Sequence, residues 1–109
     1  MSAVAVAAAF DRDADILVLD AEMPREALLG QIRGSRVEFT LIVVGAELAP
    51  VDRATMFASI GPLAIELGPD RRIGAIEVRA GARESDIVAL ARFLSGAEST
   101  TGQVLAVSG

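Results

Sequence analysis

The chain contains no cysteine, histidine, lysine, tyrosine, tryptophan or asparagine among its 109 residues. These absences remove the thiol nucleophile, the imidazole base, the amine that forms Schiff bases and the phenolic acid from the usual catalytic groups. Without cysteine or histidine, ordinary zinc and iron–sulfur sites are excluded, as is a disulfide framework. Aspartate, glutamate, arginine, serine and threonine remain for chemistry. The composition therefore argues against an enzyme and predicts no metal site.

Positive charge is also scarce. The 10 basic residues, all arginine, face 15 acidic ones, and the net charge of −5 argues against a nucleic-acid partner. The mean hydropathy is +0.49, yet the longest unbroken apolar run, residues 3–10, is too short to cross a membrane. No basic segment precedes that run, so we expect no secretory signal and a cytoplasmic protein. An apolar chain without a membrane span indicates a surface buried against a partner.

Short apolar runs alternate with amphipathic stretches, and no linker or repeat divides them, so residues 1–109 are expected to form one domain. The apolar and β-branched runs predict buried strands at residues 16–19, 39–44, 73–78 and 103–107. Helical spacing predicts helices at residues 24–32, 52–67 and 85–94. This alternation predicts an α/β fold with a parallel sheet and helices on both faces. Residues 1–10 suit either a strand or a helix.

Several residues mark where the predicted helices begin and end. Pro24 and Gly34 suit the start and the stop of the first helix. Asp52 is the expected N-cap of the second helix, and Gly96 is a plausible end of the third. Pro62 lies inside the second helix and removes one backbone hydrogen bond, so we expect a kink or a break there.

Two short patterns resemble ligand-binding loops. Asp11, Asp13 and Asp15 alternate like calcium ligands, but the glycine and the glutamate that complete such a loop are missing. A solvated acidic turn is the better interpretation. Residues 30–36 have arginine where a pyrophosphate loop needs its third glycine, and they follow a helical pattern rather than a strand. The end of a helix explains them better than a phosphate-binding loop.

Four arginines flank the third predicted strand, namely Arg71, Arg72, Arg79 and Arg83. Guanidinium groups grouped in this way can bind an anionic ligand. Isolated arginines at strand ends are more often surface residues, and that is the interpretation we adopt.

The second half of the chain carries three motifs in the order found in one family. Residues 64–69 read A-I-E-L-G-P, and Ile73 and Gly81 then match the ends of the pattern I-R-V-N-A-I-x-P-G. Residues 84–95 are similar to E-D-I-A-x-x-x-x-F-L-x-S, and residues 101–109 to T-G-Q-x-L-x-V-D-G. With these motifs the chain resembles the short-chain dehydrogenases/reductases (SDRs).

The resemblance implies a three-layer half-Rossmann fold, with a parallel sheet equivalent to SDR strands 4-5-6-7 and without the N-terminal nucleotide-binding half. The tyrosine and the lysine of the family's Y-x-x-x-K pair fall at Ala49 and Arg53, and the catalytic serine falls at Gly45. Since alanine cannot transfer a proton, the resemblance implies a degenerate catalytic site. It also implies no cofactor, because the glycine-rich loop that binds the pyrophosphate belongs to the missing half.

The resemblance implies an assembly as well. In SDRs the helix equivalent to residues 52–67 joins a four-helix bundle between subunits, and the last strand with the helix before it forms a second interface. Both elements are present here, whereas the catalytic elements are not. The candidate interface residues are Met56, Phe57, Ile60, Leu63, Phe93, Val104, Leu105 and Val107.

We therefore expect a non-catalytic SDR-like subunit that stabilises or modulates a full-length catalytic SDR-family subunit in a hetero-oligomer. Some mixed assemblies of the family act on acyl-CoA thioesters, which makes these one candidate substrate class of such a complex. The alternative is a self-associating binding or scaffold protein with no enzyme partner. An enzyme in its own right, which would bind a nicotinamide cofactor, and a fragment without function also stay open.

Overall fold

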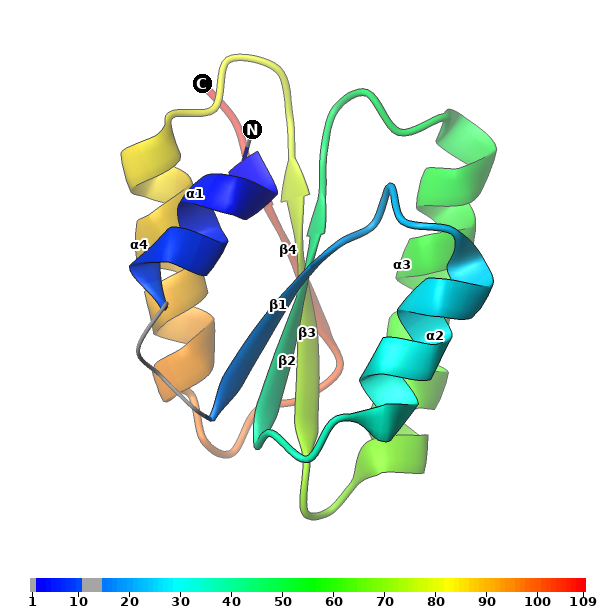
Figure 1. Cartoon of the computed structure of the whole chain (residues 1–109). Helices are drawn as coiled ribbons and strands as arrows, with labels where there is room; N and C mark the ends of the chain where they lie inside the picture. Colours follow the sequence, from blue (N-terminus) through cyan, green and yellow to red (C-terminus); the bar gives the residue numbers. More distant parts are fainter. Residues whose placement is uncertain (1, 11–14) are drawn as a thin grey trace.

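The computed structural model describes residues 2–10 and 15–109, which form an α/β fold in three layers (Figure 1). The elements along the chain are α1 (Ser2–Ala9), β1 (Ile16–Asp20), α2 (Arg25–Gly34), β2 (Phe39–Val44), α3 (Pro50–Leu67), β3 (Arg72–Val78), α4 (Glu84–Gly96) and β4 (Gln103–Val107). The sheet order is β1-β2-β3-β4, and all three pairings are parallel. The predicted fold class is confirmed, and residues 2–9 are helical.

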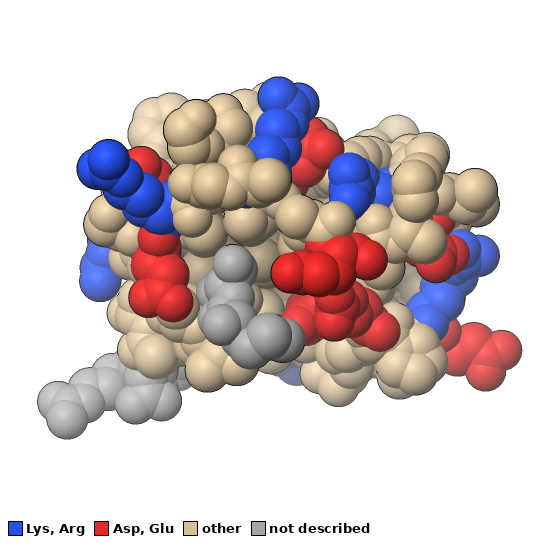
Figure 2. Space-filling model, turned by 90° about the horizontal axis from the view of Figure 1, so that it is seen from above, with Lys and Arg blue, Asp and Glu red and all other residues tan. Residues whose placement is uncertain are grey.

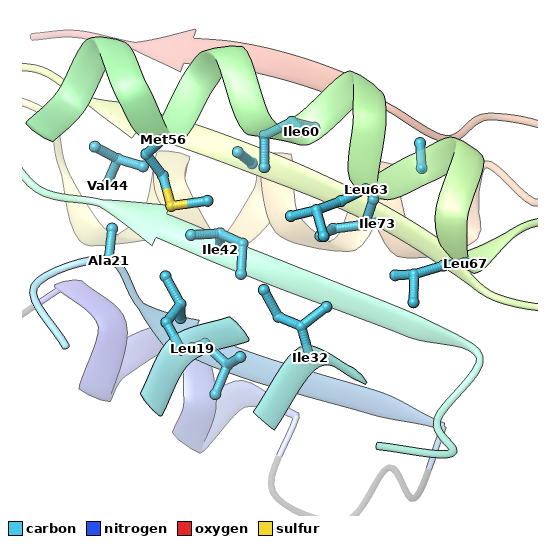
Figure 3. Close-up of a cluster of buried hydrophobic side chains, with 13 residues drawn as sticks. Leu19, Ala21, Ile32, Ile42, Val44, Met56, Ile60, Leu63, Leu67 and Ile73 are labelled. Atoms are coloured by element: carbon cyan, nitrogen blue, oxygen red, sulfur yellow. The ribbon is translucent and has the colours of Figure 1, made fainter. Parts of the chain in front are cut away.

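The core has two halves, one on each face of the sheet. On one face α2 and α3 cover the sheet, and Ile42 points at Ile32 and Met56 (Figure 3). On the other face α1 and α4 pack against Phe39 and its neighbours. The two central strands are the most buried because both of their faces are covered, which explains their unbroken apolar sequence.

The third crossover of the sheet differs in hand from the first two. All three crossovers advance in the same direction across the sheet, but α2 and α3 lie on one face and α4 lies on the other. Either the first two crossovers or the third must therefore be left-handed, and about 2% of helical crossovers between parallel strands have this hand. Helix α1 lies beside α4 in the same layer and packs over β1 (Figure 1).

The start of α3 corrects one prediction, and its course corrects another. The N-cap is Ala49, which makes no side-chain capping bond, and Asp52 lies within the first turn of the helix. There its charge interacts favourably with the helix dipole. The helix also continues through Pro62 without a break. Pro62 lies on the exposed side of α3, so the carbonyl that lacks its usual partner can bind water.

Two adjacent arginines hold the ends of two helices on opposite faces of the sheet. The Arg71 guanidinium donates to the carbonyl oxygens of Ile32 and Ser35 at the end of α2. The Arg72 guanidinium donates to carbonyl oxygens in the last turn of α4 and just after it. The last carbonyls of a helix have no partner within the helix, and both arginines supply one. Arg72 is only 7% exposed, so the prediction of a surface residue was wrong there.

A salt bridge joins α2 to α3 at the exposed ends of these helices. The Arg33 guanidinium lies 2.8 Å from one carboxylate oxygen of Glu66 and 3.1 Å from the other. Through the hydrogen bond first, and then through its charge, Arg33 lowers the pKa of the Glu66 carboxyl. A carboxylate with a lowered pKa stabilises the folded state above its unfolded pKa, and this stabilisation is lost as the pH falls through the folded pKa.

We expect Glu66→Gln to lower the melting temperature slightly at neutral pH and to have no effect in acid below the folded pKa of Glu66. Thermal unfolding followed by circular dichroism at both pH values measures this difference. Glu98→Gln, an exposed carboxylate on the loop after α4, is the matched control and should leave the melting temperature unchanged at both. A difference for Glu66→Gln that persists in acid would assign its effect to packing instead of charge.

Candidate functional site

The three positions that the SDR resemblance aligns with catalytic residues lie at the carboxyl end of β2. Gly45 directly follows the strand, Ala49 is the N-cap of α3, and Arg53 lies in the first turn of that helix. Open α/β sheets bind ligands at this end of their strands, between neighbouring loops. The sequence therefore placed the candidate positions in a plausible region, but two of the three side chains there carry no functional group.

Arg53 makes its contacts within its own loop. Its Nη2 atom donates to the carbonyl oxygens of Ala46, at 2.8 Å, and Leu48, at 3.0 Å. Its Nε atom is buried and has no acceptor among the residues that the structure describes. The guanidinium thus fixes the connection between β2 and α3.

The loop after β1 is held in a similar way. The Asp20 carboxylate accepts a hydrogen bond of 2.9 Å from the amide of Glu22. This is a local turn of the kind that aspartate commonly forms with the backbone two residues further on. Asp20 therefore shapes the start of the connection that leads to α2.

A cavity of about 280 Å³ opens between α2 and α3, beside these two loops. Its lining combines apolar side chains with charged and hydroxyl groups: Ala21, Glu22, Met23, Pro24, Arg25, Leu28, Leu29, Leu48, Asp52, Thr55, Met56 and Ser59. The volume is at the lower limit for a small-molecule site. The sequence did not reveal the cavity, because it lies between segments that are far apart in the chain and share no motif.

Residues 30–36, the pattern that resembles a pyrophosphate loop, form no binding loop in the described structure. Residues Gly30 and Gly34 lie in the second half of α2, and Ser35 is its C-cap, so this segment is the end of a helix, as predicted. The described residues hold no group of three acidic side chains that could bind a metal ion. Asp11 and Asp13 of the alternating acidic pattern lie outside the described residues.

A family model described as "SDR-like: Short chain dehydrogenase-like protein" matches residues 18–107. The chain belongs to the SDR-like family. The match starts inside β1 and ends with β4, so it spans nearly the whole sheet. Curated proteins and solved structures give no match. At 109 residues, this SDR-like chain is too short for a full catalytic SDR. No helix within its described part has the length and the apolar character to span a membrane.

The candidate interface residues of this SDR-like chain occupy three kinds of environment. On α3, Met56, Ile60 and Leu63 point at the sheet and are 8%, 0% and 5% exposed (Figure 3). Phe57 is half-buried against the same cluster. Phe93 on α4 is 65% exposed.

The three candidates on β4 lie along the outer strand of the sheet. Val104 is 36% exposed, and Leu105 and Val107 are half-buried against the α1 and α4 side of the core. Among all eight candidates, Phe93 and Val104 are therefore the most accessible to another subunit, while the three buried residues of α3 belong to the core of this chain.

The outer face of α3 carries exposed apolar residues that are not among the predicted interface residues. Val51 is 76% exposed and Ile65 is 84% exposed. Their spacing of fourteen residues, close to four helical turns, places them on one side of the helix. The sequence carries this second apolar pattern beside the stronger one of Met56, Ile60 and Leu63, which forms the core.

Proposed function

We propose that this SDR-like chain is a non-catalytic subunit that binds a full-length catalytic SDR-family subunit and stabilises or modulates it. The observation that carries the proposal is the apolar outer face of α3. Val51, Ala54, Ala58, Gly61 and Ile65 recur every three or four residues along this face, and each of them is exposed. A continuous apolar surface without charge is typical of a contact with another protein.

The small residues in the middle of this face favour a helix as the contacting element. Ala54, Ala58 and Gly61 project little from α3. The space beside Gly61 is open, because even an added Cβ atom there would meet no atom within 4 Å. A second helix can therefore approach α3 closely, with the larger Val51 and Ile65 packing at the two ends of the contact. The SDR resemblance implies a four-helix bundle at the same helix, which agrees with this surface.

The residues at the catalytic positions support the non-catalytic part of the proposal. The chain has neither tyrosine nor lysine, so no residue of this chain supplies the proton-transfer pair of an SDR. Arg53, at the lysine position, is engaged with two carbonyl oxygens of its own loop. The catalytic chemistry would then belong to the partner, for which acyl-CoA thioesters are one substrate class to assay.

Co-expression with a full-length SDR encoded next to this chain tests the proposal. We expect the tagged chain to retain the SDR through purification, native mass spectrometry to show one hetero-oligomer, and the SDR to melt at a higher temperature in the complex. An unrelated SDR, co-expressed in the same way, is the control and should not be retained. NADH fluorescence should not change when the chain alone is added. A monodisperse monomer that binds no neighbouring SDR would overturn the proposal.

Self-association is the second candidate function, and the same face of α3 supports it. An apolar helix face can pack against its own copy around a two-fold axis, because such an interface needs only one self-complementary surface. Native mass spectrometry distinguishes the two functions. A homodimer or homotetramer that does not exchange subunits with an SDR favours a scaffold without an enzyme partner.

A further inference from the structure

The outer edge of β1 is open to another strand. β1 pairs only with β2, and none of the residues in the described part of the chain forms a strand on its other side. The Phe39 amide donates to the Asp15 carbonyl, and the Ala21 amide donates to the Val43 carbonyl, each at 3.0 Å. Backbone groups alternate sides along a parallel strand. Since Asp15 and Ala21 face β2, the amides and carbonyls of the even-numbered residues between them point away from β2.

These outward-pointing groups are the amides of Ile16, Val18 and Asp20 and the carbonyls of Ile16 and Val18, while the Asp20 carbonyl accepts the Met23 amide in the turn after the strand. Together the amides and the two carbonyls form a row of donors and acceptors, which is a template for a further strand. Proteins usually protect such an edge with proline, charged side chains such as lysine, or a bulge. The strand sequence Ile-Leu-Val-Leu-Asp contains no proline, and its single charged residue, Asp20, is at its end.

The side chains of β1 are those of an internal strand. Ile16 and Val18 pack against the core on the α1 and α4 side, and Leu17 and Leu19 pack against the core on the α2 and α3 side. None of these four side chains is exposed, although β1 is an edge strand of the sheet. β4, at the opposite edge, has exposed residues at three of its five positions. An added strand beside β1 would therefore extend both halves of the core.

The charge around β1 indicates what kind of strand fits there. Residues 11–22, which begin just before β1 and end just after it, contain five acidic residues and one arginine, a net charge of −4 out of −5 for the chain. Helix α1 carries no charged residue, and Arg33 of α2 is paired with Glu66. Figure 2 views the end of the sheet where the strands finish, and acidic side chains gather near its middle.

A second copy of this chain does not fit this edge well. Acidic residues flank β1 at both ends, with Asp15 before it and Asp20 and Glu22 at and after its end. Parallel and antiparallel pairing of two copies would each bring acidic residues opposite acidic residues, which destabilises a sheet. A strand that carries positive charge at both ends is complementary in either direction.

We propose that the outer edge of β1 binds an extended segment of a partner protein, apolar at its centre and flanked by lysine or arginine, as an added strand of the sheet. The proposal does not rest on the function proposed above, because it uses a strand edge and not the outer face of α3. The SDR-like chain would then have two separate contact surfaces.

A synthetic peptide tests the proposal on the intact chain. The probe is a fluorescein-labelled peptide, Lys-Lys-Val-Thr-Val-Thr-Val-Lys-Lys, and the control peptide has glutamate at each lysine position. We expect fluorescence anisotropy to show saturable binding of the lysine peptide and at least about tenfold weaker binding of the glutamate peptide. In a ¹⁵N–¹H spectrum, the largest amide shifts should occur at Ile16, Val18 and Asp20.

Two proline variants locate the binding edge. Val18→Pro removes an outward amide and costs no hydrogen bond to β2, and edge strands accept proline at such positions. Val104→Pro is the matched control on β4: since the Val107 carbonyl accepts the Arg79 amide, the Val104 amide faces away from β3 by the same alternation. We expect Val18→Pro to weaken peptide binding at least about tenfold and Val104→Pro to leave it unchanged. The reverse result would overturn the proposal.

A charge variant keeps the proposal testable if Val18→Pro does not fold. Asp20→Asn combined with Glu22→Gln preserves the backbone and an oxygen that can accept the residue 22 amide, but it removes two negative charges. The lysine peptide should then bind several-fold more weakly, and the difference between the two peptides should shrink. Equal affinity for both peptides in the unmodified chain, or a homodimer that Asp20→Asn with Glu22→Gln strengthens, would show that the partner chemistry is wrong.

Discussion

Replacing Arg72 with alanine should lower the free energy of unfolding by about 3 kcal/mol, because buried hydrogen bonds from a charged group are lost and their acceptors are left without partners. Nη1 and Nη2 of Arg72 donate to the carbonyl oxygens of Leu94, Ser95 and Ala97, at 3.3, 2.9 and 2.9 Å. The guanidinium also lies 4.8 Å from the centre of the Phe39 ring. For a domain of this size, the loss corresponds to a melting temperature lower by roughly 10–20 °C.

Urea unfolding of a small series of variants separates the contributions. Arg72→Met keeps most of the side-chain volume over Phe39 but removes every hydrogen-bond donor. Its free energy of unfolding should therefore fall by most of the amount expected for Arg72→Ala. Arg72→Lys keeps the charge without the forked geometry and should fall between the unmodified chain and Arg72→Met. Arg36 is exposed and makes no hydrogen bond or ion pair with the described residues, so Arg36→Ala should stay within about 0.5 kcal/mol of the unmodified chain. Equal unfolding midpoints for Arg72→Ala and Arg36→Ala would contradict the capping role.

The strands and helices could be predicted because their signals are local. The run from Phe39 to Val44 is β2 with the predicted bounds, and its complete burial follows from helices on both faces of the sheet. Two glycines of the family motifs have a local physical reason as well. Gly81 and Gly102 have φ of 83° and 77°, a conformation that side-chain-bearing residues rarely adopt. The motifs thus record backbone requirements, which a sequence pattern expresses directly.

The features that the sequence did not predict depend on contacts between distant segments. Arg71 and Arg72 cap α2 and α4 across the chain, at separations that no local pattern encodes. The N-cap at Ala49 has a different cause. Pro50 is the first residue of α3, and proline favours the first helical position strongly enough to begin the helix before Asp52. The opposite hand of the third crossover likewise follows from how α4 packs on the sheet.

In the candidate site, too, the sequence predicts the positions of residues along the chain, but not the contacts that their side chains make. The resemblance aligned Gly45, Ala49 and Arg53 with catalytic positions, and these residues do lie together at the end of β2. The contacts of the Arg53 guanidinium with Ala46 and Leu48 became visible only in the folded chain. The SDR resemblance assigned Ile60 of α3 to a contact surface between subunits, but the structure gives that side chain 0% exposure. A periodic pattern shows that a face is apolar, and only the packing shows whether the chain itself covers it.

Glutamate at both Val51 and Ile65 should weaken the proposed complex with a catalytic SDR at least about a hundredfold, because two charges would be buried in a contact that has no group to pair with them. The two side chains are 76% and 84% exposed in this chain, so each substitution should change its own stability by no more than about 0.5 kcal/mol. Biolayer interferometry of the tagged variant with the purified SDR measures the loss, and circular dichroism confirms that the fold is retained.

Two further variants assign the contact to a specific surface. Ala8→Glu places a charge on the exposed side of α1, in the other helical layer, and should leave the affinity unchanged. Phe93→Glu changes the exposed aromatic residue of α4, which belongs to the second interface that the SDR resemblance implies. If Val51→Glu with Ile65→Glu has no effect and Phe93→Glu abolishes binding, the partner contacts α4 and β4, and the outer face of α3 is not the interface. Loss of binding with the α3 variant alone assigns the contact to the helix whose apolar outer face carries the proposal.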